Sequence, residues 1–183
     1  FSTALGAVNI TGDLKSDTTL QDFDFCGHVS TMNFQLGQML NNSDLGAVKF
    51  HAHMDIEVDS MAFRQCKADM KINQIEYRGY TYEDIQFDGE VTTEQMNGYL
   101  NIQDENVQLT MEGLADWSKK DTRLDITAHL EDLRPEAIHL TEAYPEMAIS
   151  ATAYVNLYTS GELNQVLDNL TGYIIIDTLD VRN

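Results

Sequence analysis

Strict alternation of apolar and polar residues runs through most of this chain. Between positions 48 and 58 every second side chain is apolar, and lysine, histidine and acids stand between them. The same alternation returns at 8–14, 85–91, 98–102, 107–113, 124–130 and 147–157. A period of two is typical of antiparallel strands with one covered and one solvated face, whereas buried parallel strands are continuously apolar. The pattern therefore predicts an all-β, mostly antiparallel sheet of about ten strands.

The connections between these strands are short. Asp104-Glu105-Asn106 and the stretch 93–97 each fit a tight hairpin, so strands that follow one another in sequence should pair as a meander. Two segments depart from the alternation. The segment 134–140, RPEAIHL, suits a helical turn after Pro135. A second segment has the spacing of one short helix, carried by Leu163, Val166, Leu167 and Leu170.

Three of the predicted strands contain one slip of phase each. The apolar phase continues after two intervening residues, not one, in the pairs Val29 and Met32, Ile72 and Ile75, and Ile176 and Leu179. A β-bulge inserts one extra residue and bends the strand while both halves keep facing one side. Chance variation of phase is the alternative. If the slips are bulges at one level of the sheet, the sheet curls along a line.

The size of the apolar face limits what the sheet can do with it. Ten strands at ~4.8 Å spacing and eight residues at ~3.3 Å give a face on the order of 1,200 Å². Soluble monomers rarely expose apolar patches above a few hundred Å². The chain has no amphipathic helix long enough to cover such a face. The sheet must close into a barrel, split into a sandwich, or curl into a groove-shaped, taco-like half-barrel with an apolar interior.

Methionine is unusually frequent in the apolar phase of the alternation. Flexible, polarizable methionine side chains adapt to ligands of varying shape, although they also fill irregular cores. The methionines in the apolar phase are Met32, Met54, Met70, Met111 and Met147. On this ground alone, an ordinary core is the simpler interpretation.

The composition excludes some partners. Thirty acids against eleven bases give a net charge of −19, which is unsuitable for nucleic acid because phosphate binding needs a basic surface. The acids are spread along the chain and are best interpreted as a solvated face. Cys26 and Cys66 form no CxxC motif, and no apolar run approaches the ~20 residues of a membrane helix.

Sites for catalysis or metal binding are weakly indicated. No motif of a hydrolase, metalloprotease or nucleotide-binding protein is present, and no cofactor is implied. His51 and His53 share the polar phase with Asp55 and Glu57 and could hold a metal, but solvated strand residues are the simpler interpretation. The same holds for the carboxylate pairs of a glycosidase, for which the candidates are Asp22 with Asp24 and Asp88 with Glu90.

Three aromatic residues are candidates for stacking on sugar rings. They are Tyr80, Tyr82 and Trp117. Aromatic residues at a strand edge or rim are the simpler interpretation. If they bind, the chain would be a β-sandwich module for glycan or protein, which is the alternative to a groove.

Several segments together resemble one family. The stretches ADMKINQIEYRGYTYEDIQFDGEV, MNGYLNIQDENVQLTMEGLADW and LEDLRPEAIHLT, with LGAV at Leu5 and again at Leu45, are similar to the periplasmic repeats of TamB/AsmA-like envelope proteins. The matching features are Tyr77, Gly79, Tyr80, Tyr82, the strand 85–89, Gly98, the turn 104–106 and Gly113. The resemblance covers most of the chain, but its motifs are patterned strands without catalytic residues.

The resemblance implies a non-enzymatic role. Members of this family are anchored in the inner membrane, extend through the periplasm as a β-groove, carry phospholipid between membranes, and support outer-membrane protein assembly with a barrel partner. By this resemblance, residues 1–183 would be one segment of a longer repeat array. Its repeat-like units would lie near 5–44, 45–91, 92–141 and 142–183. Copies of such a segment could also associate through their open sheet edges.

On this hypothesis, phospholipid acyl chains lie along the apolar face and the acids stay at the watery rim. The residues expected to line the groove are inward-facing members of successive strands: Phe50, Met54, Met70, Ile72, Phe87, Leu100, Leu109, Met111, Ile126, Ile149 and Val155. The groove needs no fixed polar site, because burial of each methylene contributes roughly 0.8 kcal/mol.

Overall fold

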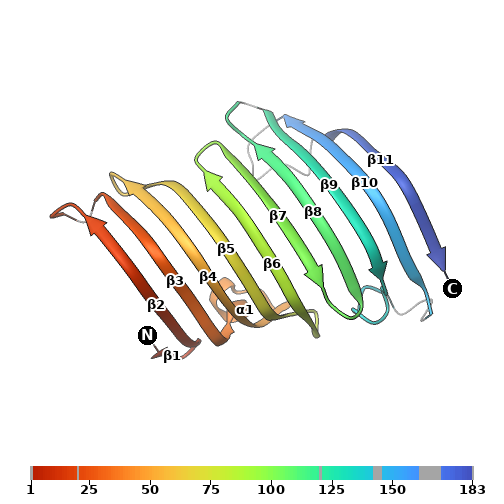
Figure 1. Cartoon of the computed structure of the whole chain (residues 1–183), viewed down its shortest axis with the longest axis horizontal. Helices are drawn as coiled ribbons and strands as arrows, with labels where there is room; N and C mark the ends of the chain where they lie inside the picture. The colour runs from red at the N-terminus through yellow and green to blue at the C-terminus, as the bar shows by residue number, and fades with distance from the viewer. Residues whose placement is uncertain (1, 20, 120, 142–145, 161–169, 183) are drawn as a thin grey trace.

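The protein is a single open β-sheet. The computed structural model describes residues 2–19, 21–119, 121–141, 146–160 and 170–182. The strands lie side by side in the order in which they occur in the sequence, and all neighbouring strands are antiparallel (Figure 1). The first and last strands lie at opposite edges, so the sheet curls without closing into a barrel. This confirms the predicted all-β fold and excludes two stacked sheets in the described part of the chain.

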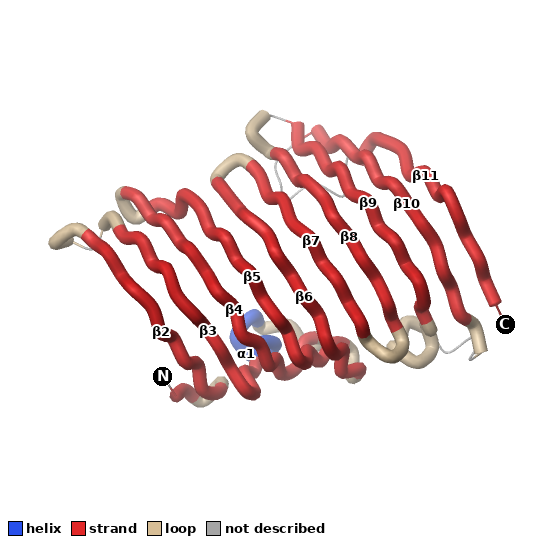
Figure 2. Tube along the Cα trace, viewed as in Figure 1, coloured by secondary structure: helices blue, strands red, loops and turns tan. Residues whose placement is uncertain are grey.

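Most of the described residues belong to long strands, with one short helix beside them (Figure 2). The strands are β1 (Ser2–Thr3), β2 (Gly6–Ser16), β3 (Phe23–Gln35), β4 (Leu45–Asp59), β5 (Ala62–Tyr77), β6 (Tyr80–Thr92), β7 (Gln95–Gln103), β8 (Val107–Asp116), β9 (Asp121–Leu133), β10 (Ala148–Ser160) and β11 (Leu170–Arg182). The helix is α1 (Leu36–Leu40), which the alternation did not predict. Among the described residues, no helix has the length and apolarity to cross a membrane.

The predicted connections have mixed outcomes. The turn at 104–106 joins β7 to β8 as expected, and the hairpin predicted at 93–97 is present with a shorter turn, at 93–94, because β7 already begins at Gln95. The segment after Pro135 forms turns closed by a hydrogen bond of 2.8 Å from the Leu140 amide to the Pro135 carbonyl. The helix predicted around 163–170 lies outside the described residues apart from Leu170, which begins β11.

Two of the three phase slips are bulges where they were predicted. In β11 the register with β10 shifts so that Ala153 pairs with Ile176 and Thr152 pairs with Thr178, which leaves one extra residue between them. In β5 the register with β4 shifts between Lys49 and Phe50, next to the predicted slip at 73–74. The apolar phase is therefore kept on one face through both strands.

The bulge in β3 comes later than predicted. Thr31 still pairs with Phe50, and the register with β4 shifts only between Thr31 and Phe34. Thr31 occupies the inward phase, where it is buried. Its hydroxyl can be buried there because it donates a 2.9 Å hydrogen bond to the Ala7 carbonyl. Met32 then falls within the bulge and is 69% exposed, so its assignment to the apolar face is wrong.

The fully buried core is small and lies mainly towards one end of the sheet. Among the described residues the buried apolar side chains are Val48, Ala52, Ala68, Ile85, Val107 and Ile138. Helix α1 contacts β4 at this end, and the 134–141 segment is fastened there by a 2.9 Å hydrogen bond from the Arg134 amide to the Asn106 carbonyl. The rest of the apolar face has no second layer of described residues over it.

Candidate functional site

The strand register assembles the apolar residues into continuous rows that cross the sheet. Cross-strand partners in an antiparallel sheet share a face, so each row can be followed from strand to strand. The middle row consists of Ala52, Met70, Phe87, Leu100, Met111, Ala128, Ala153 and Ile176. These residues come from β4 to β11 without a polar interruption. We call the side of the sheet that carries these rows the apolar face.

Two further rows flank the middle row. Towards the α1 end lie Phe50, Ile72, Ile85, Ile102, Leu109, Leu130, Ala151 and Leu179. On the other side lie Met54, Ala68, Gly89, Gly98, Gly113, Ile126, Val155 and Ile174. Apart from Ile149, which pairs with Leu133 and Val181 in the next row, every residue predicted to line a groove lies in these three rows.

The predicted lining residues are all half-buried, neither enclosed nor fully exposed. A hollow of about 150 Å³ lies on the apolar face between β6 and β9, with Phe87, Met96, Leu100, Met111 and Ile126 among its lining residues. An ordinary core would bury such side chains almost completely, since interiors are close-packed. The apolar face is therefore accessible to a ligand with its own apolar surface.

Glycines on this face make room for two phenylalanine rings. A Cβ atom added to Gly89 would lie 2.6 Å from Phe87 Cζ, and one added to Gly98 would lie 3.1 Å from Phe87 Cε2. Phe25 lies over the cross-strand pair Gly12 and Gly27 in the same way. These four glycines leave space on the apolar face. In the structure an aromatic ring fills that space, an arrangement that pins strand register.

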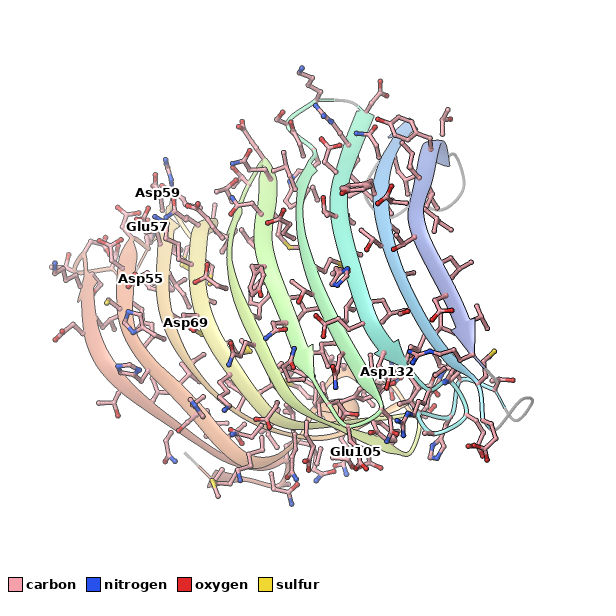
Figure 3. The ribbon with its side chains drawn as sticks, turned by 45° about the vertical axis from the view of Figure 1, so that its right-hand side comes forward. Asp55, Glu57, Asp59, Asp69, Glu105 and Asp132 are labelled. Atoms are coloured by element: carbon pink, nitrogen blue, oxygen red, sulfur yellow. The ribbon has the colours of Figure 1, made fainter. Side chains whose placement is uncertain are left out.

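The opposite, polar face is acidic. Asp55, Glu57 and Asp59 follow one another along β4, and Asp69 lies on the neighbouring β5 (Figure 3). Lysines on β5 offset part of this charge, and Lys71 forms a 3.3 Å ion pair with Asp84. The exposed pairs contribute little stability individually. The two faces differ because alternate residues of each strand point to opposite sides of the sheet, and these residues alternate between apolar and polar.

The predicted sugar-stacking aromatics have structural partners. The Tyr80 hydroxyl donates a 2.5 Å hydrogen bond to Asp104, and the Tyr80 and Tyr82 rings meet edge to face at 4.8 Å. Burial, and then the bond to Asp104, raises the pKa of Tyr80 to about 12. The Trp117 indole donates a 2.8 Å hydrogen bond to the Thr93 carbonyl and so links two turns. The three residues fasten connections and do not form one platform.

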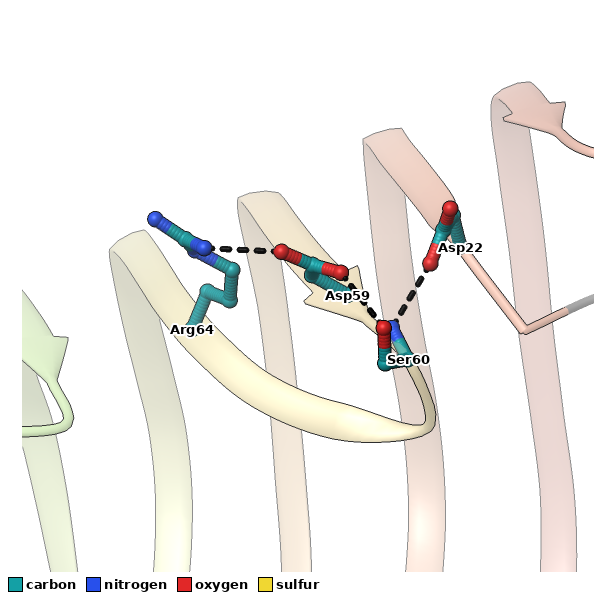
Figure 4. Close-up of polar contacts among 4 residues, drawn as sticks. All are labelled: Asp22, Asp59, Ser60 and Arg64. Atoms are coloured by element: carbon teal, nitrogen blue, oxygen red, sulfur yellow. Dashed lines mark hydrogen bonds and ion pairs between the residues drawn. The ribbon is translucent and has the colours of Figure 1, made fainter.

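The candidate carboxylate pairs also have structural partners. Asp22 accepts a 2.6 Å hydrogen bond from the Ser60 amide, which joins the β2–β3 and β4–β5 turns (Figure 4). Glu90 lies 3.7 Å from Lys67. Among the described acids, hydrogen bonds within turns lower the pKa values of Asp17, Asp59 and Asp116. A general acid needs a raised pKa, so Asp17, Asp59 and Asp116 are unsuited to that role.

One group of possible metal ligands was only half visible in the sequence. His53 and Asp55 do approach a common point, but their neighbours there are Cys26 and His28 of β3, not His51 and Glu57. Hydrogen bonding to Asp55 raises the pKa of the Cys26 thiol. In the sequence, the only sign of this group is the spacing Cys-x-His at 26–28 and His-x-Asp at 53–55. The two pairs become neighbours only when the β3–β4 register is known.

No protein-family model matches the chain, and no curated protein or solved structure is significantly similar to it. The features from which a function can be inferred are therefore those of the site itself: the half-buried apolar rows and the acidic face behind them.

Proposed function

We propose that this protein is a non-enzymatic lipid-binding segment whose apolar face holds phospholipid acyl chains. The observation that carries the proposal is the set of apolar rows that cross the sheet from β4 to β11, most of whose residues are half-buried. A ligand that covers them gains roughly 0.8 kcal/mol for each methylene it buries. Acyl chains suit this surface because it offers extended apolar contact and few polar groups.

The rows also suit movement of lipid along the sheet. Successive strands present similar side chains at ~4.8 Å intervals, so a chain displaced by one strand meets an equivalent surface. Head groups would stay in water at the rim. Together with the resemblance to TamB/AsmA-like proteins, this leads us to propose a role in the periplasm, between inner and outer membrane, with an outer-membrane barrel as the partner in protein assembly.

The open edge of the sheet at β11 could pair with further strands. Ile174, Ile176 and Leu179 of edge strand β11 are 60%, 55% and 60% exposed, and they continue the three rows. Further strands added at this edge, from the same chain or a second copy, would lengthen the apolar face. Sedimentation velocity over a range of concentrations tests association between copies. A monomer at every concentration would oppose it.

The decisive experiment places a charge on the apolar face. Leu109→Glu and Ile126→Glu each put a carboxylate among the rows, whereas Thr110→Glu puts the same charge on the polar face of β8, opposite Asn101 and His129. Each variant is checked for its β-sheet circular dichroism. Lipid is then measured in two ways: by mass spectrometry of lipid extracted from the purified protein, and by titration with a fluorescent fatty-acid probe.

We expect both apolar-face variants to lose lipid and probe while Thr110→Glu retains them, because burying a charge against acyl chains is costly. Folded Leu109→Glu and Ile126→Glu proteins that bind as well as wild type would refute the proposal. The alternative, a β-sandwich module that binds glycan or protein, does not match the single open sheet, and Tyr80 and Trp117 form hydrogen bonds with residues of turns. Glycan or protein binding itself stays a prediction.

A further inference from the structure

Four side chains with metal-binding atoms meet at the corners of a small quadrilateral on the polar face. Cys26 and His28 are two residues apart on β3, and His53 and Asp55 are two residues apart on β4. The antiparallel register places Cys26 opposite Asp55 and His28 opposite His53. Directly opposed residues have Cβ atoms ~5 Å apart, which is within reach of one shared ion.

The ligand atoms are already close to one another. Cys26 Sγ lies 3.9 Å from His53 Nε2, and His53 Nε2 lies 4.0 Å from Asp55 Oδ1. All three ligand atoms lie within 4.8 Å of one another, and among the described residues this is the one such group. A tetrahedral zinc ion with bonds of 2.0–2.3 Å places its ligand atoms about 3.3–3.8 Å apart. Small side-chain rotations would therefore complete the geometry.

His28 can supply a fourth ligand. The rings of His28 and His53 have their centroids 4.9 Å apart and are tilted by 49°, so they are not stacked face to face. A rotation of His28 can direct one ring nitrogen towards the same point. Thiolate, two imidazoles and a carboxylate are together a zinc ligand set, since zinc accepts sulfur, nitrogen and oxygen ligands.

The surroundings favour a cation. Asp69 of β5 is the cross-strand neighbour of His53, and Asp13 of β2 is that of Cys26. The side chains of His53 and Asp55 are 44% and 48% exposed, so an ion can enter from solvent. Lys67, which pairs with Asp55 in the register, carries an opposing charge and is itself engaged with Glu90.

We propose that Cys26, His28, His53 and Asp55 form a zinc-binding site on the polar face. The bound ion would join β3 to β4 on the side opposite the apolar rows and restrain the curl of the sheet there. The site is independent of lipid binding, because none of its ligands belongs to the apolar face. A positive or a negative result for zinc binding therefore does not affect the proposed lipid-binding function.

The first test measures zinc affinity by competition with a fluorescent chelator. Cys26→Ser and His53→Ala should each weaken zinc binding at least about tenfold, since even residues that only support metal ligands typically cost 10–100-fold. His51→Ala is the matched control: it removes a histidine from the same strand and face, but His51 pairs with Ser30 and Lys71. Equal affinity in all variants, or no competition by the wild type, would overturn the proposal.

Two further measurements use the unaltered protein and so do not depend on the folding of variants. Cobalt(II) should give the sulfur-to-metal charge-transfer absorption and the visible bands of a tetrahedral site. Zinc should slow alkylation of Cys26, and a chelator should restore it. Cys66 provides an internal reference, since it pairs with Ile56 and Val91 on the apolar face. Octahedral cobalt spectra together with unchanged labelling of Cys26 would refute the site.

Discussion

The Tyr80 hydroxyl donates a hydrogen bond of 2.5 Å to the Asp104 carboxylate and accepts one of 3.1 Å from the Asn106 amide group. The same carboxylate accepts bonds from the backbone amides of Glu83 and Asn106, each 2.9 Å long. Asp104 is only 3% exposed. The β7–β8 turn is therefore fastened to the first residues of β6 through one buried acid.

Tyr80→Phe should destabilise the protein. It removes one donor from a buried carboxylate, and the loss of a hydrogen bond to a charged group typically costs about 1–3 kcal/mol. Tyr99→Phe is the control, because Tyr99 is a 40% exposed tyrosine on β7. Urea unfolding measures the free energy of unfolding of both variants and of the wild type. A Tyr80→Phe protein as stable as wild type would show that the Asp104 contact contributes little.

Stability should also fall at alkaline pH. Burial and the Asp104 bond raise the pKa of Tyr80 to about 12, whereas a tyrosine in an unfolded chain titrates near about 10. Between these values the folded state holds more protons than the unfolded state, so the free energy of unfolding falls as pH rises. The contribution is complete below pH ~10 and is lost as pH passes through the folded value.

The alkaline effect can be assigned to its residue. Burial also raises the pKa of Tyr82, so part of the loss should persist in Tyr80→Phe. Urea unfolding across the alkaline range should give a shallower fall for the variant than for wild type. Ultraviolet absorbance of tyrosinate follows the titration directly. Identical pH dependence of the two proteins would mean that Tyr80 is not responsible.

Gly89→Ala should be destabilising, although alanine is normally better than glycine in a strand. The new Cβ would lie 2.6 Å from Phe87 Cζ and 2.8 Å from the Asn97 carbonyl oxygen. Overpacking of this kind typically costs about 1–3 kcal/mol. Gly79, at φ +76°, is a different case, because its conformation and not a neighbouring ring favours glycine.

A double-mutant cycle isolates the ring from the backbone contact. In a Phe87→Leu background, Gly89→Ala should cost less, because the ring is gone while the Asn97 oxygen remains. Urea unfolding of the four proteins gives the coupling energy. Costs that add to within about 0.3–0.5 kcal/mol would show that Phe87 and Gly89 are independent.

The sequence predicted the sheet well because its alternation is a local property. Phe87, Met111 and Val155 could be assigned to one face from their neighbours in sequence alone. Pairings between strands were harder. Cys26 and His53 become neighbours only through the β3–β4 register, which depends on the bulge after Thr31 and on the connection from β3 to β4 through α1.

Hydrogen bonds over longer separations were equally hidden from the sequence. Tyr80 resembles a rim aromatic until β6 and β7 are paired and bring Asp104 beside it. Met32 looked like part of the apolar phase because the sequence does not show that the Thr31 hydroxyl is satisfied inside. Helix α1 lacks the repeated apolar spacing that reveals longer helices, so its five residues gave no signal.

The turn cluster in Figure 4 gives a prediction at acidic pH. A hydrogen bond from Ser60 and then one from Arg64 lower the pKa of Asp59, so its contribution to stability is present above the ordinary value of 3.8 and is lost as pH falls through the folded value. Arg64 Nη1 lies 2.8 Å from Asp59 Oδ2, and Ser60 Oγ lies 2.9 Å from Asp59 Oδ1.

NMR titration of the Asp59 carboxyl carbon tests this assignment. Ser60→Gly and Arg64→Gln should each raise the pKa of Asp59 towards its ordinary value, because the first removes the Ser60 hydrogen bond and the second removes both the hydrogen bond and the charge of Arg64. Glycine is chosen because Ser60 has φ 53°, where alanine would add strain. Arg134→Gln removes the same charge from the far end of the sheet and should leave Asp59 unchanged. An unchanged pKa of Asp59 in either variant would show that the contact removed there does not hold the carboxylate in its charged form.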